Sequence, residues 1–291
     1  MSPDDFDLEL IFQPAAAVES YMSDVIDQRA LPGNLRDAAR YALLGPGKRV
    51  RPILVIRSSE AVGGDAAAAM RAAAAIEMIH CFSLVHDDLP AMDDDDLRRG
   101  RPTLHKHTSE AMGILAGDLL TGLAFEHLAS ADAHATALVR ELAAATNDMI
   151  AGQVYDTMPD FDETLEPLER LRTIHHNKTA ALIRCSCRMG GIIGGADDAQ
   201  LHGLTRYGEA IGLMFQVIDD LLDVTQTTEK LGKASNKDAE QGKLTYPALL
   251  GVEGSRAEVQ RLQAQAHDAL ADLECTDRLR ELCDFMAVRT K

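Results

Sequence analysis

Tryptophan is absent from the 291-residue sequence, and aromatic residues together make up 4% of it. Sheet proteins are enriched in aromatic and β-branched residues, so this shortage argues against an all-β fold. Alanine and leucine are abundant instead and favour closely packed helices. Hydrophobic residues make up 46% of the chain, enough at this length to bury a large core without disulfides or metal ions. We therefore predict an all-α fold, with one domain over residues 1–291 built as a bundle of about ten or more helices.

Cysteine is scarce and shows no ligand or redox pattern. The five residues form no CxxC pair and have no histidine at zinc-finger spacing; they are Cys81, Cys185, Cys187, Cys275 and Cys283. We expect buried thiols in a reducing compartment. The N-terminal stretch MSPDDFDLELIF is acidic where a signal peptide is basic, and we find no run of about 18 apolar residues. The expectation is a cytoplasmic protein without a membrane span.

Positive charge is also in short supply, with 29 Lys and Arg against 46 Asp and Glu and a net charge of −17. Binding to nucleic acid needs a positively charged surface, so we expect no nucleic-acid partner. Six of the carboxylates lie in one ten-residue stretch, at Asp87, Asp88 and Asp93 to Asp96.

Apolar residues recur at spacings of three and four along most of the chain, which is the period of a helix. Asp65 is the expected N-cap of one of these helices, and Thr225 to Gly242 form a polar segment that we expect to be a loop over a site. The predicted helices are 6–29, 34–44, 49–62, 66–89, 108–130, 134–155, 165–193, 197–225 and 243–250, with a C-terminal pair from about 255.

The first aspartate cluster lies in the segment HDDLPAMDDDDLRRGRP, which begins at His86. Pro90 cannot lie inside a helix, so Asp87 and Asp88 are expected in the last helical turn and Asp93 in a turn that folds back beside them. Several carboxylates at one helix end repel each other unless a cation lies among them, and they offer the oxygen ligands that a hard cation prefers. The cluster therefore predicts a divalent metal site.

The second cluster is Asp219, Asp220 and Asp223. Asp219 and Asp223 share a helix face, whereas Asp220 is turned away by about 100°. Two such clusters predict a shared site for Mg²⁺, which is commonly bound by one or two carboxylates together with substrate phosphates. Lysines and arginines that suit phosphate oxygens accompany the clusters, namely Lys48, Arg49, Arg51, Arg98, Arg99, Lys178, Lys233 and Lys243.

Each pattern also has a simpler interpretation. A run of aspartates is commonly a solvated face, the basic residues after a glycine-rich turn are commonly surface charge, and His80 fits a core histidine. His175, His176 and the Cys185 and Cys187 pair lack a third type of ligand nearby, so we assign them structural roles. The joint occurrence of both clusters with the cations favours a functional site.

Four segments resemble the motifs of trans-isoprenyl diphosphate synthases, and the chain is most similar to the bacterial farnesyl diphosphate synthase type. They are GPGKRVRP, LVHDDLPAMDDDDLRRGRPT, HHNKTAAL and FQVIDDLLDVTQTTEKLGK, and the resemblance spans roughly residues 40 to 251 in the family's order. It implies an all-α bundle around a deep central cavity. It also implies a prenyltransferase that condenses isopentenyl diphosphate with dimethylallyl and geranyl diphosphate to (2E,6E)-farnesyl diphosphate. The expected steps are ionisation, condensation and elimination, and the expected assembly is a homodimer.

The resemblance also implies roles for individual residues. About three Mg²⁺, or alternatively Mn²⁺, would be bound by the metal ligands. The implied metal ligands are Asp87, Asp88, Asp93, Asp219, Asp220 and Asp223. The implied contacts to the allylic diphosphate are Arg98, Lys178, Gln216, Lys233 and Lys243, and Thr179 and Phe215 are further implied substrate-binding residues. The implied isopentenyl diphosphate site is Lys48, Arg51, His80 and Arg99. The catalytic set comprises Asp87, Asp88, Asp93, Arg98, Lys178, Thr179, Asp219 and Lys233.

Product length depends on the residues before the first motif, and here the resemblance points to Phe82 and Ser83. Phe82 precedes Asp87 by five residues, about 7.5 Å along a helix axis. Helical periodicity turns it about 140° from Asp87, so its role in stopping elongation at fifteen carbons follows from the resemblance and not from geometry. Pro46, Ala180 and Asn236 stand where glycine is usual in the family. Asparagine tolerates a left-handed backbone, so Asn236 is a mild departure, whereas Pro46 and Ala180 put the fine positioning of substrate in question.

Several alternatives stay open. A geranylgeranyl synthase, or one of another chain length, has the same clusters. A terpene cyclase ionises allylic diphosphates but has no use for the site at Lys48, Arg51 and His80. From another class, the chain could be a non-catalytic regulatory subunit of a prenyl synthase or an acidic cation-binding module. The presence of both motifs together with the phosphate-facing cations favours an enzyme.

Overall fold

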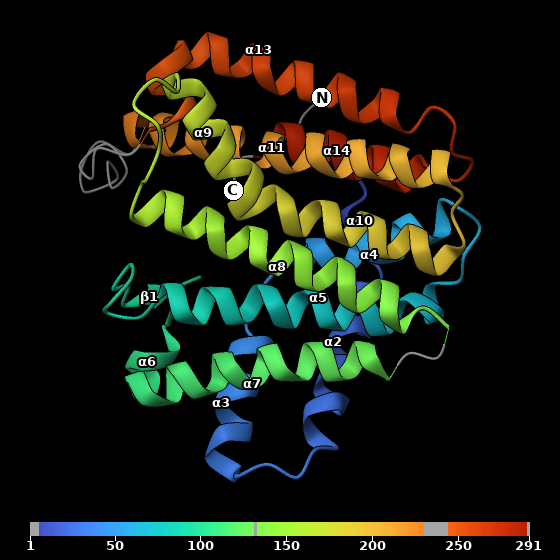
Figure 1. The fold of residues 1–291 in the computed structure, drawn as a ribbon, viewed down its shortest axis with the longest axis vertical. Helices are drawn as coiled ribbons and strands as arrows, with labels where there is room; N and C mark the ends of the chain where they lie inside the picture. Colours follow the sequence, from blue (N-terminus) through green and yellow to red (C-terminus); the bar gives the residue numbers. More distant parts are fainter. Residues whose placement is uncertain (1–5, 131–132, 230–243, 290–291) are drawn as a thin grey trace. The chain divides into compact units, whose positions relative to one another are not determined.

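The structure is a computed structural model that describes residues 6–130, 133–229 and 244–289. The described chain is helical apart from a small antiparallel hairpin of β1 (Leu97–Arg98) and β2 (Arg101–Pro102), which confirms the all-α prediction (Figure 1). It divides into two compact units. We name them the N-terminal unit (Phe12–Ala143 and Met189–Gly195) and the C-terminal unit (Met1–Ile11, Ala144–Arg188 and Ala196–Lys291). The single domain over residues 1–291 stays a prediction.

The N-terminal unit is organised around α5 (Ala66–Asp87), which packs against α4 (Val50–Glu60) and α7 (Glu110–Ala129) (Figure 1). The Asp65 side chain accepts a hydrogen bond from the Ala67 backbone N–H at 3.3 Å and confirms the predicted N-cap. Farther along the helix Ala69 and Ala72 to Ala75 are buried, and their small side chains let neighbouring helices approach closely. The other helices of this unit are α2 (Ala15–Asp27), α3 (Gly33–Leu43), α6 (Leu104–His107) and the first part of α8 (Ala135–Thr157).

One property of α5 departs from the expectation that no segment resembles a membrane span. The helix is long and apolar enough to cross a bilayer, but 67% of its most apolar stretch is buried inside the protein. The core helix of a folded domain has the same length and composition. The burial therefore identifies α5 as a core helix.

The C-terminal unit is built on the packing of α11 (Asp198–Glu229) against α13 (Tyr246–Ala269). Tyr207 and Tyr246 are fully buried between its helices, and the Tyr207 hydroxyl donates to the Leu279 carbonyl at 2.7 Å. Burial raises the pKa of Tyr207 well above its usual value, so this hydroxyl stays a donor. The remaining elements are α1 (Leu8–Ile11), the rest of α8, α9 (Pro167–His175), the π-helix η2 (His176–Ala180), α14 (Asp277–Val288) and the part of α10 (Ala181–Gly194) up to Arg188.

Several element boundaries differ from the predictions, and the expected helix 165–193 is observed as α9, η2 and α10. The expected helix 6–29 is two helices, α1 and α2, with Pro14 directly before α2, because proline lacks the N–H that a continuous helix needs. The expected helix 243–250 continues as α13 past Gly251, a kink with φ of 71° that glycine adopts without strain. Helix α11 extends through Glu229, so the first residues of the expected 225–242 loop are helical.

Four cysteines are buried as predicted: Cys81, Cys185, Cys187 and Cys283. The expectation is wrong for Cys275, which is exposed. It lies in the short connection between α13 and α14, and connections between helices run over the protein surface.

Candidate active site

The first aspartate motif begins at the C-terminal end of α5 and folds back on it. Helix α5 ends at Asp87, the chain turns at Pro90, and the Asp93 backbone N–H donates to the Asp87 carbonyl at 2.8 Å. Asp94 adopts a left-handed conformation, with φ of 48°, within this turn. The predicted approach of Asp93 to Asp87 is therefore confirmed for the backbone.

Asp88 points into the protein, where it meets Arg98 on β1. The Asp88 side chain is 5% exposed, and its carboxylate accepts a hydrogen bond of 2.6 Å from Nε of Arg98. Nη2 of Arg98 lies 3.6 Å from the Asp95 carboxylate. Burial raises the pKa of Asp88, and the Arg98 guanidinium opposes that rise. The pair links the end of α5 to the hairpin and so fixes the position of the motif.

The donor set of the first motif fits a hard divalent cation. Asp87 is partly buried and Asp93 is exposed, and both present carboxylate oxygens, the ligands that Mg²⁺ prefers. The C-terminal end of a helix carries partial negative charge and attracts cations. Asp87 and Asp93 are the residues that would hold such an ion here.

Two of the cations expected at the isopentenyl diphosphate site, Arg51 and Arg99, lie near enough to His80 on α5 to act on its charge. The pKa of His80 is lowered well below its usual value by burial and by the positive charges of Arg51, Arg99, Arg98 and Arg49. Lys48 is exposed, and Arg99 donates to the Pro46 carbonyl at 2.6 Å. The structure therefore brings His80, Arg51 and Arg99 into one electrostatic neighbourhood. Pro46 keeps the carbonyl that Arg99 uses, so this departure from glycine leaves the contact intact.

The residues expected to control product length lie on the same helix. Phe82 is buried and its ring meets the His86 ring edge-on, with centroids 5.6 Å apart. The Ser83 hydroxyl donates to the His80 carbonyl at 2.9 Å, within the helix. Phe82 thus offers a bulky side chain next to the motif, whereas the Ser83 hydroxyl is bonded to its own helix.

The second motif lies on α11, where Asp219 is bonded to Arg289 from the C-terminal end of the chain. Arg289 donates to the Asp219 carboxylate and, at 3.2 Å, to the Phe215 carbonyl, and its guanidinium lies 3.8 Å from the centre of the Phe215 ring. Gln216 lies within 3.5 Å of the other Asp219 oxygen. Burial raises the pKa of Asp219, and Arg289 opposes that rise. Sequence reasoning missed Arg289, because a lone arginine near a terminus carries no motif.

Asp220 is turned away from Asp219, as the helical spacing predicts. Its carboxylate is buried and accepts a hydrogen bond of 2.9 Å from the Tyr246 backbone N–H at the start of α13. His175 lies 3.8 Å from the same carboxylate, and its ring stacks on that of Tyr246. Asp223 is exposed. The role of Asp220 and Asp223 in metal binding stays a prediction.

Lys178 and Thr179 lie in the π-helix η2, an irregularity that is frequent at functional sites. Lys178 bonds Asp156 on α8 at 2.6 Å, and Thr179 is buried. A Cβ at Gly152 would lie 2.2 Å from the Lys178 nitrogen, so α8 approaches η2 more closely than a side chain allows. Ala180 similarly lies against Gly212, whose missing side chain leaves space for the alanine. Lys233, Lys243 and Asn236 lie outside the described residues.

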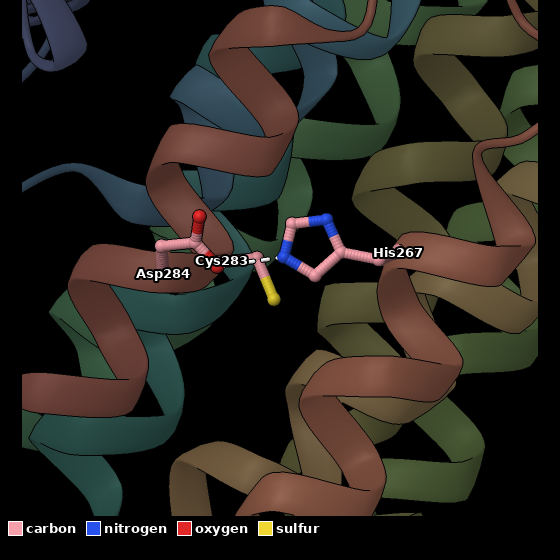
Figure 2. A group of neighbouring side chains, drawn as sticks. All are labelled: His267, Cys283 and Asp284. Atoms are coloured by element: carbon pink, nitrogen blue, oxygen red, sulfur yellow. Dashed lines mark hydrogen bonds and ion pairs between the residues drawn. The ribbon is translucent and has the colours of Figure 1, made fainter.

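A separate group of His267, Cys283 and Asp284 brings three ligand types within 4.8 Å of one another (Figure 2). His267 Nε2 lies 2.6 Å from Asp284 and Nδ1 lies 2.9 Å from Arg280. A guanidinium can only donate, so Nδ1 accepts and Nε2 carries the proton shared with Asp284. Burial raises the pKa of Cys283 to about 12, which keeps the thiol protonated. These contacts make the group a hydrogen-bonded link between α13 and α14.

Comparisons with known proteins agree with the two motifs. The model of the family described as polyprenyl synthetase matches residues 32–286. The chain is 47% identical to a putative geranylgeranyl pyrophosphate synthase 8 of Arabidopsis thaliana over 93% of this chain and 77% of that protein. It is similar to a solved FPP/GFPP synthase of Zymomonas mobilis, with a TM-score of 0.83 and 33% identity over 97% of this chain and 99% of the other. It is also similar to a geranylgeranyl pyrophosphate synthetase of Pyrococcus horikoshii, with a TM-score of 0.88 and 31% identity over 97% and 98%. The chain therefore belongs to the polyprenyl synthetase family and is a prenyltransferase of the prenyl diphosphate synthase kind.

Proposed function

We propose that the protein extends an allylic diphosphate with isopentenyl diphosphate and that its principal product is geranylgeranyl diphosphate. The observation that carries this product length is the 47% identity to the relative from Arabidopsis thaliana over 93% of this chain. That relative and others at 44% to 49% identity are named geranylgeranyl pyrophosphate synthases. The farnesyl product that the motifs suggested becomes the second candidate.

A specific observation keeps the farnesyl candidate in view. Phe82 is buried on α5 five residues before Asp87, the position to which the resemblance assigns the limit on chain length. Similar solved structures include the FPP/GFPP synthase from Zymomonas mobilis and, at 36% identity, a putative farnesyl-diphosphate synthase from Marinomonas. The two candidates share one reaction and differ in the number of condensations.

In the proposed reaction the allylic C–O bond breaks, and its electron pair leaves with the diphosphate. Asp87, Asp93 and Asp219 would hold Mg²⁺, which when bound supplies positive charge to the departing diphosphate. The resemblance assigns Arg98 and Lys178 to the allylic diphosphate, whose developing negative charge such cations stabilise. The residues assigned to isopentenyl diphosphate hold its diphosphate so that its double bond attacks the allylic carbon. Loss of one proton from the new cation, to the released diphosphate, completes the step without a side-chain nucleophile.

The test is a product analysis with three primers. The protein is incubated with Mg²⁺, isopentenyl diphosphate and, separately, dimethylallyl, geranyl or farnesyl diphosphate, and the dephosphorylated products are separated by chain length. We expect twenty-carbon product from each primer and none after removal of Mg²⁺ by a chelator. Accumulation of farnesyl product that is not extended supports the second candidate. Absence of transfer from all three primers in excess Mg²⁺ overturns the enzymatic proposal.

We also propose that the enzyme is a homodimer. Helix α7 exposes two adjacent apolar side chains, Ile114 at 47% and Leu115 at 55%, and such side chains are commonly covered by a partner. Light scattering is expected to give twice the 31.5 kDa mass of the chain. A mass of one chain at micromolar concentration contradicts the proposal.

A further inference from the structure

In the sequence Arg49 stands between Lys48 and Arg51, two of the cations assigned to isopentenyl diphosphate, but its side chain is buried. Its side chain is 1% exposed, although Lys48 beside it is exposed. Nε donates to Glu19 on α2 at 2.9 Å, Nη1 to Glu77 on α5 at 3.0 Å, and Nη2 to the Gly45 carbonyl at 2.6 Å. Each of the three guanidinium nitrogens therefore donates to a protein group, and the buried side chain does not reach solvent to bind a substrate.

The charge balance of this group is local. The Glu77 carboxylate is 3% exposed, whereas Glu19 is 45% exposed, so Glu77 is the buried partner of Arg49. Burial by itself lowers the pKa of Arg49, but the charge of Glu77 and its hydrogen bond outweigh burial and raise it. Burying an ion pair costs desolvation energy and is weak evidence for a contribution to stability. A role in fixing one conformation explains its presence better.

The backbone supports that interpretation. Arg49 has φ of 54° and ψ of 36°, a left-handed conformation that is uncommon for residues other than glycine, at the N-cap of α4. Residues in such conformations persist where the surroundings hold them, and they cluster at functional sites. The three bonds of the guanidinium hold this residue from α2, from α5 and from the preceding turn.

The turn before Arg49 is held from a second side by Arg99. Arg99 is also left-handed, with φ of 52°, and its Nη1 donates to the Pro46 carbonyl. A Cβ at Gly47 would lie 2.4 Å from Nη1 of Arg99 and 3.2 Å from Nη1 of Arg49. Glycine at position 47 thus allows both guanidinium groups to pack against the same turn, and the turn is fixed between them.

The proposed diphosphate ligands are attached to this assembly. Lys48 directly precedes Arg49 and Arg51 lies in the first turn of α4, which begins at Val50, so the conformation of Arg49 fixes the course of the backbone that carries both residues. His80 lies three residues after Glu77 on α5, and residues at this spacing share a helix face. The Arg49–Glu77 bond therefore connects the segment that carries Lys48 and Arg51 to the helix that carries His80.

We propose that Arg49 is a positioning residue for isopentenyl diphosphate, and that its bonds to Glu77 and the Gly45 carbonyl align Lys48, Arg51 and His80 for one diphosphate. The inference rests on the proposed function, because it assumes that this site binds the homoallylic substrate. A purely structural role would lower stability and change KM for both substrates together. A positioning role raises KM for isopentenyl diphosphate selectively.

The experiment compares Arg49→Lys and Glu77→Gln with a matched control, Arg57→Gln. Arg57 lies on the same helix, is buried, and bonds Glu60 at 2.8 Å, but it is not among the residues of the site. KM for isopentenyl diphosphate, KM for the allylic primer, kcat and the thermal midpoint are measured for each protein. Lysine keeps the charge but cannot reproduce the fork of three nitrogens, so we expect KM for isopentenyl diphosphate to rise about tenfold. We expect the allylic KM to stay within about twofold and Arg57→Gln to lower only the thermal midpoint.

A double variant, Arg49→Gln with Glu77→Gln, separates alignment from folding. Removing both buried charges relieves the Arg49 charge that Glu77→Gln leaves without its buried partner, so the thermal midpoint is expected to recover relative to Glu77→Gln. KM for isopentenyl diphosphate is expected to stay raised, because the connection is still missing. An unchanged KM for isopentenyl diphosphate in Arg49→Lys and Glu77→Gln overturns the inference, as does an equal rise for both substrates or for Arg57→Gln. A wild-type protein without prenyl transfer refutes the proposed function instead, so the two failures are distinguishable.

Discussion

Arg289 and Asp219 form an ion pair that joins the C-terminal end of the chain to the first aspartate of the second motif. The Arg289 guanidinium pairs with the Asp219 carboxylate, which the proposed reaction needs as a ligand of a divalent cation. We predict that Arg289→Ala lowers the Mg²⁺ concentration for half-maximal activity roughly threefold, because a competing cation is removed. Mg²⁺ titration of the transfer rate measures this change.

The control for that titration is Arg256→Ala. Arg256 lies on α13 of the same unit and pairs with Glu253 on the surface at 3.6 Å. It is expected to leave the Mg²⁺ requirement unchanged. A higher Mg²⁺ requirement in Arg289→Ala would show that Arg289 assists metal binding instead of competing with it.

Asp93 and Asp87 form the pair of the first motif whose approach the sequence already predicts. Asp93→Asn keeps the size and shape of the side chain but removes one negative charge. We predict a loss of kcat of at least about a hundredfold, because a metal ligand that neutralises the leaving group is weakened. Asp37→Asn, on the exposed face of α3, removes the same charge elsewhere in the unit and is expected to retain wild-type kcat. Equal rates for both variants would exclude Asp93 from the metal site.

The parts of this arrangement that could be predicted are local in the sequence. Pro90 limits α5 to residues before it, and that constraint alone places Asp93 back beside Asp87. Asp65 at the start of α5 and the separation of Asp220 from Asp219 follow in the same way from helix geometry. These features depend on neighbours a few residues apart.

The missed parts depend on residues far apart in the chain. Arg289 is separated from Asp219 by 70 residues, and Arg49 from Glu77 by 28. No spacing rule connects such pairs, because tertiary packing decides which charge lies opposite which. Arg49 was grouped with the phosphate-binding cations for the same reason: its sequence position is next to Lys48, but its side chain is turned inward.

Phe82 provides the prediction on product length. Phe82→Ala removes a buried ring before Asp87, so we predict products at least one five-carbon unit longer than those of the wild type. Phe125→Ala removes a phenyl ring from α7 in the same unit and is expected to keep the wild-type product length. Chromatography of the dephosphorylated products measures both. An unchanged distribution in Phe82→Ala would rule out this ring as the limit on elongation.

His127 is expected to make stability depend on pH. Burial and the charge of Arg71 lower the pKa of His127 to about 4 from its usual value of 6.5. The unfolded state therefore binds more protons than the folded state between these values, so stability is complete above pH 6.5 and falls as pH decreases toward about 4.

Chemical denaturation at pH 7 and pH 5 tests this dependence. The wild type is expected to lose stability between the two pH values, and His127→Gln is expected to lose less. His202→Gln, at an exposed position of α11, should behave as the wild type. If His127→Gln shows the full wild-type loss, His127 does not account for it.

The close approach of α8 to η2 predicts opposite outcomes for two glycine-to-alanine changes. At Gly152 the new methyl group would lie 2.2 Å from the Lys178 nitrogen and 2.6 Å from its Cα, both backbone atoms that cannot move aside alone. We predict that Gly152→Ala destabilises the protein by about 1–3 kcal/mol, the usual cost of overpacking, and lowers kcat because Lys178 is displaced. At Gly122 on α7 no atom lies within 4 Å of the added Cβ, so Gly122→Ala should stabilise the helix by up to about 1 kcal/mol and leave kcat unchanged. Chemical denaturation measures the stability of both variants, and rate measurements give their kcat. A stable and fully active Gly152→Ala protein would mean that the contact between α8 and η2 does not constrain Lys178.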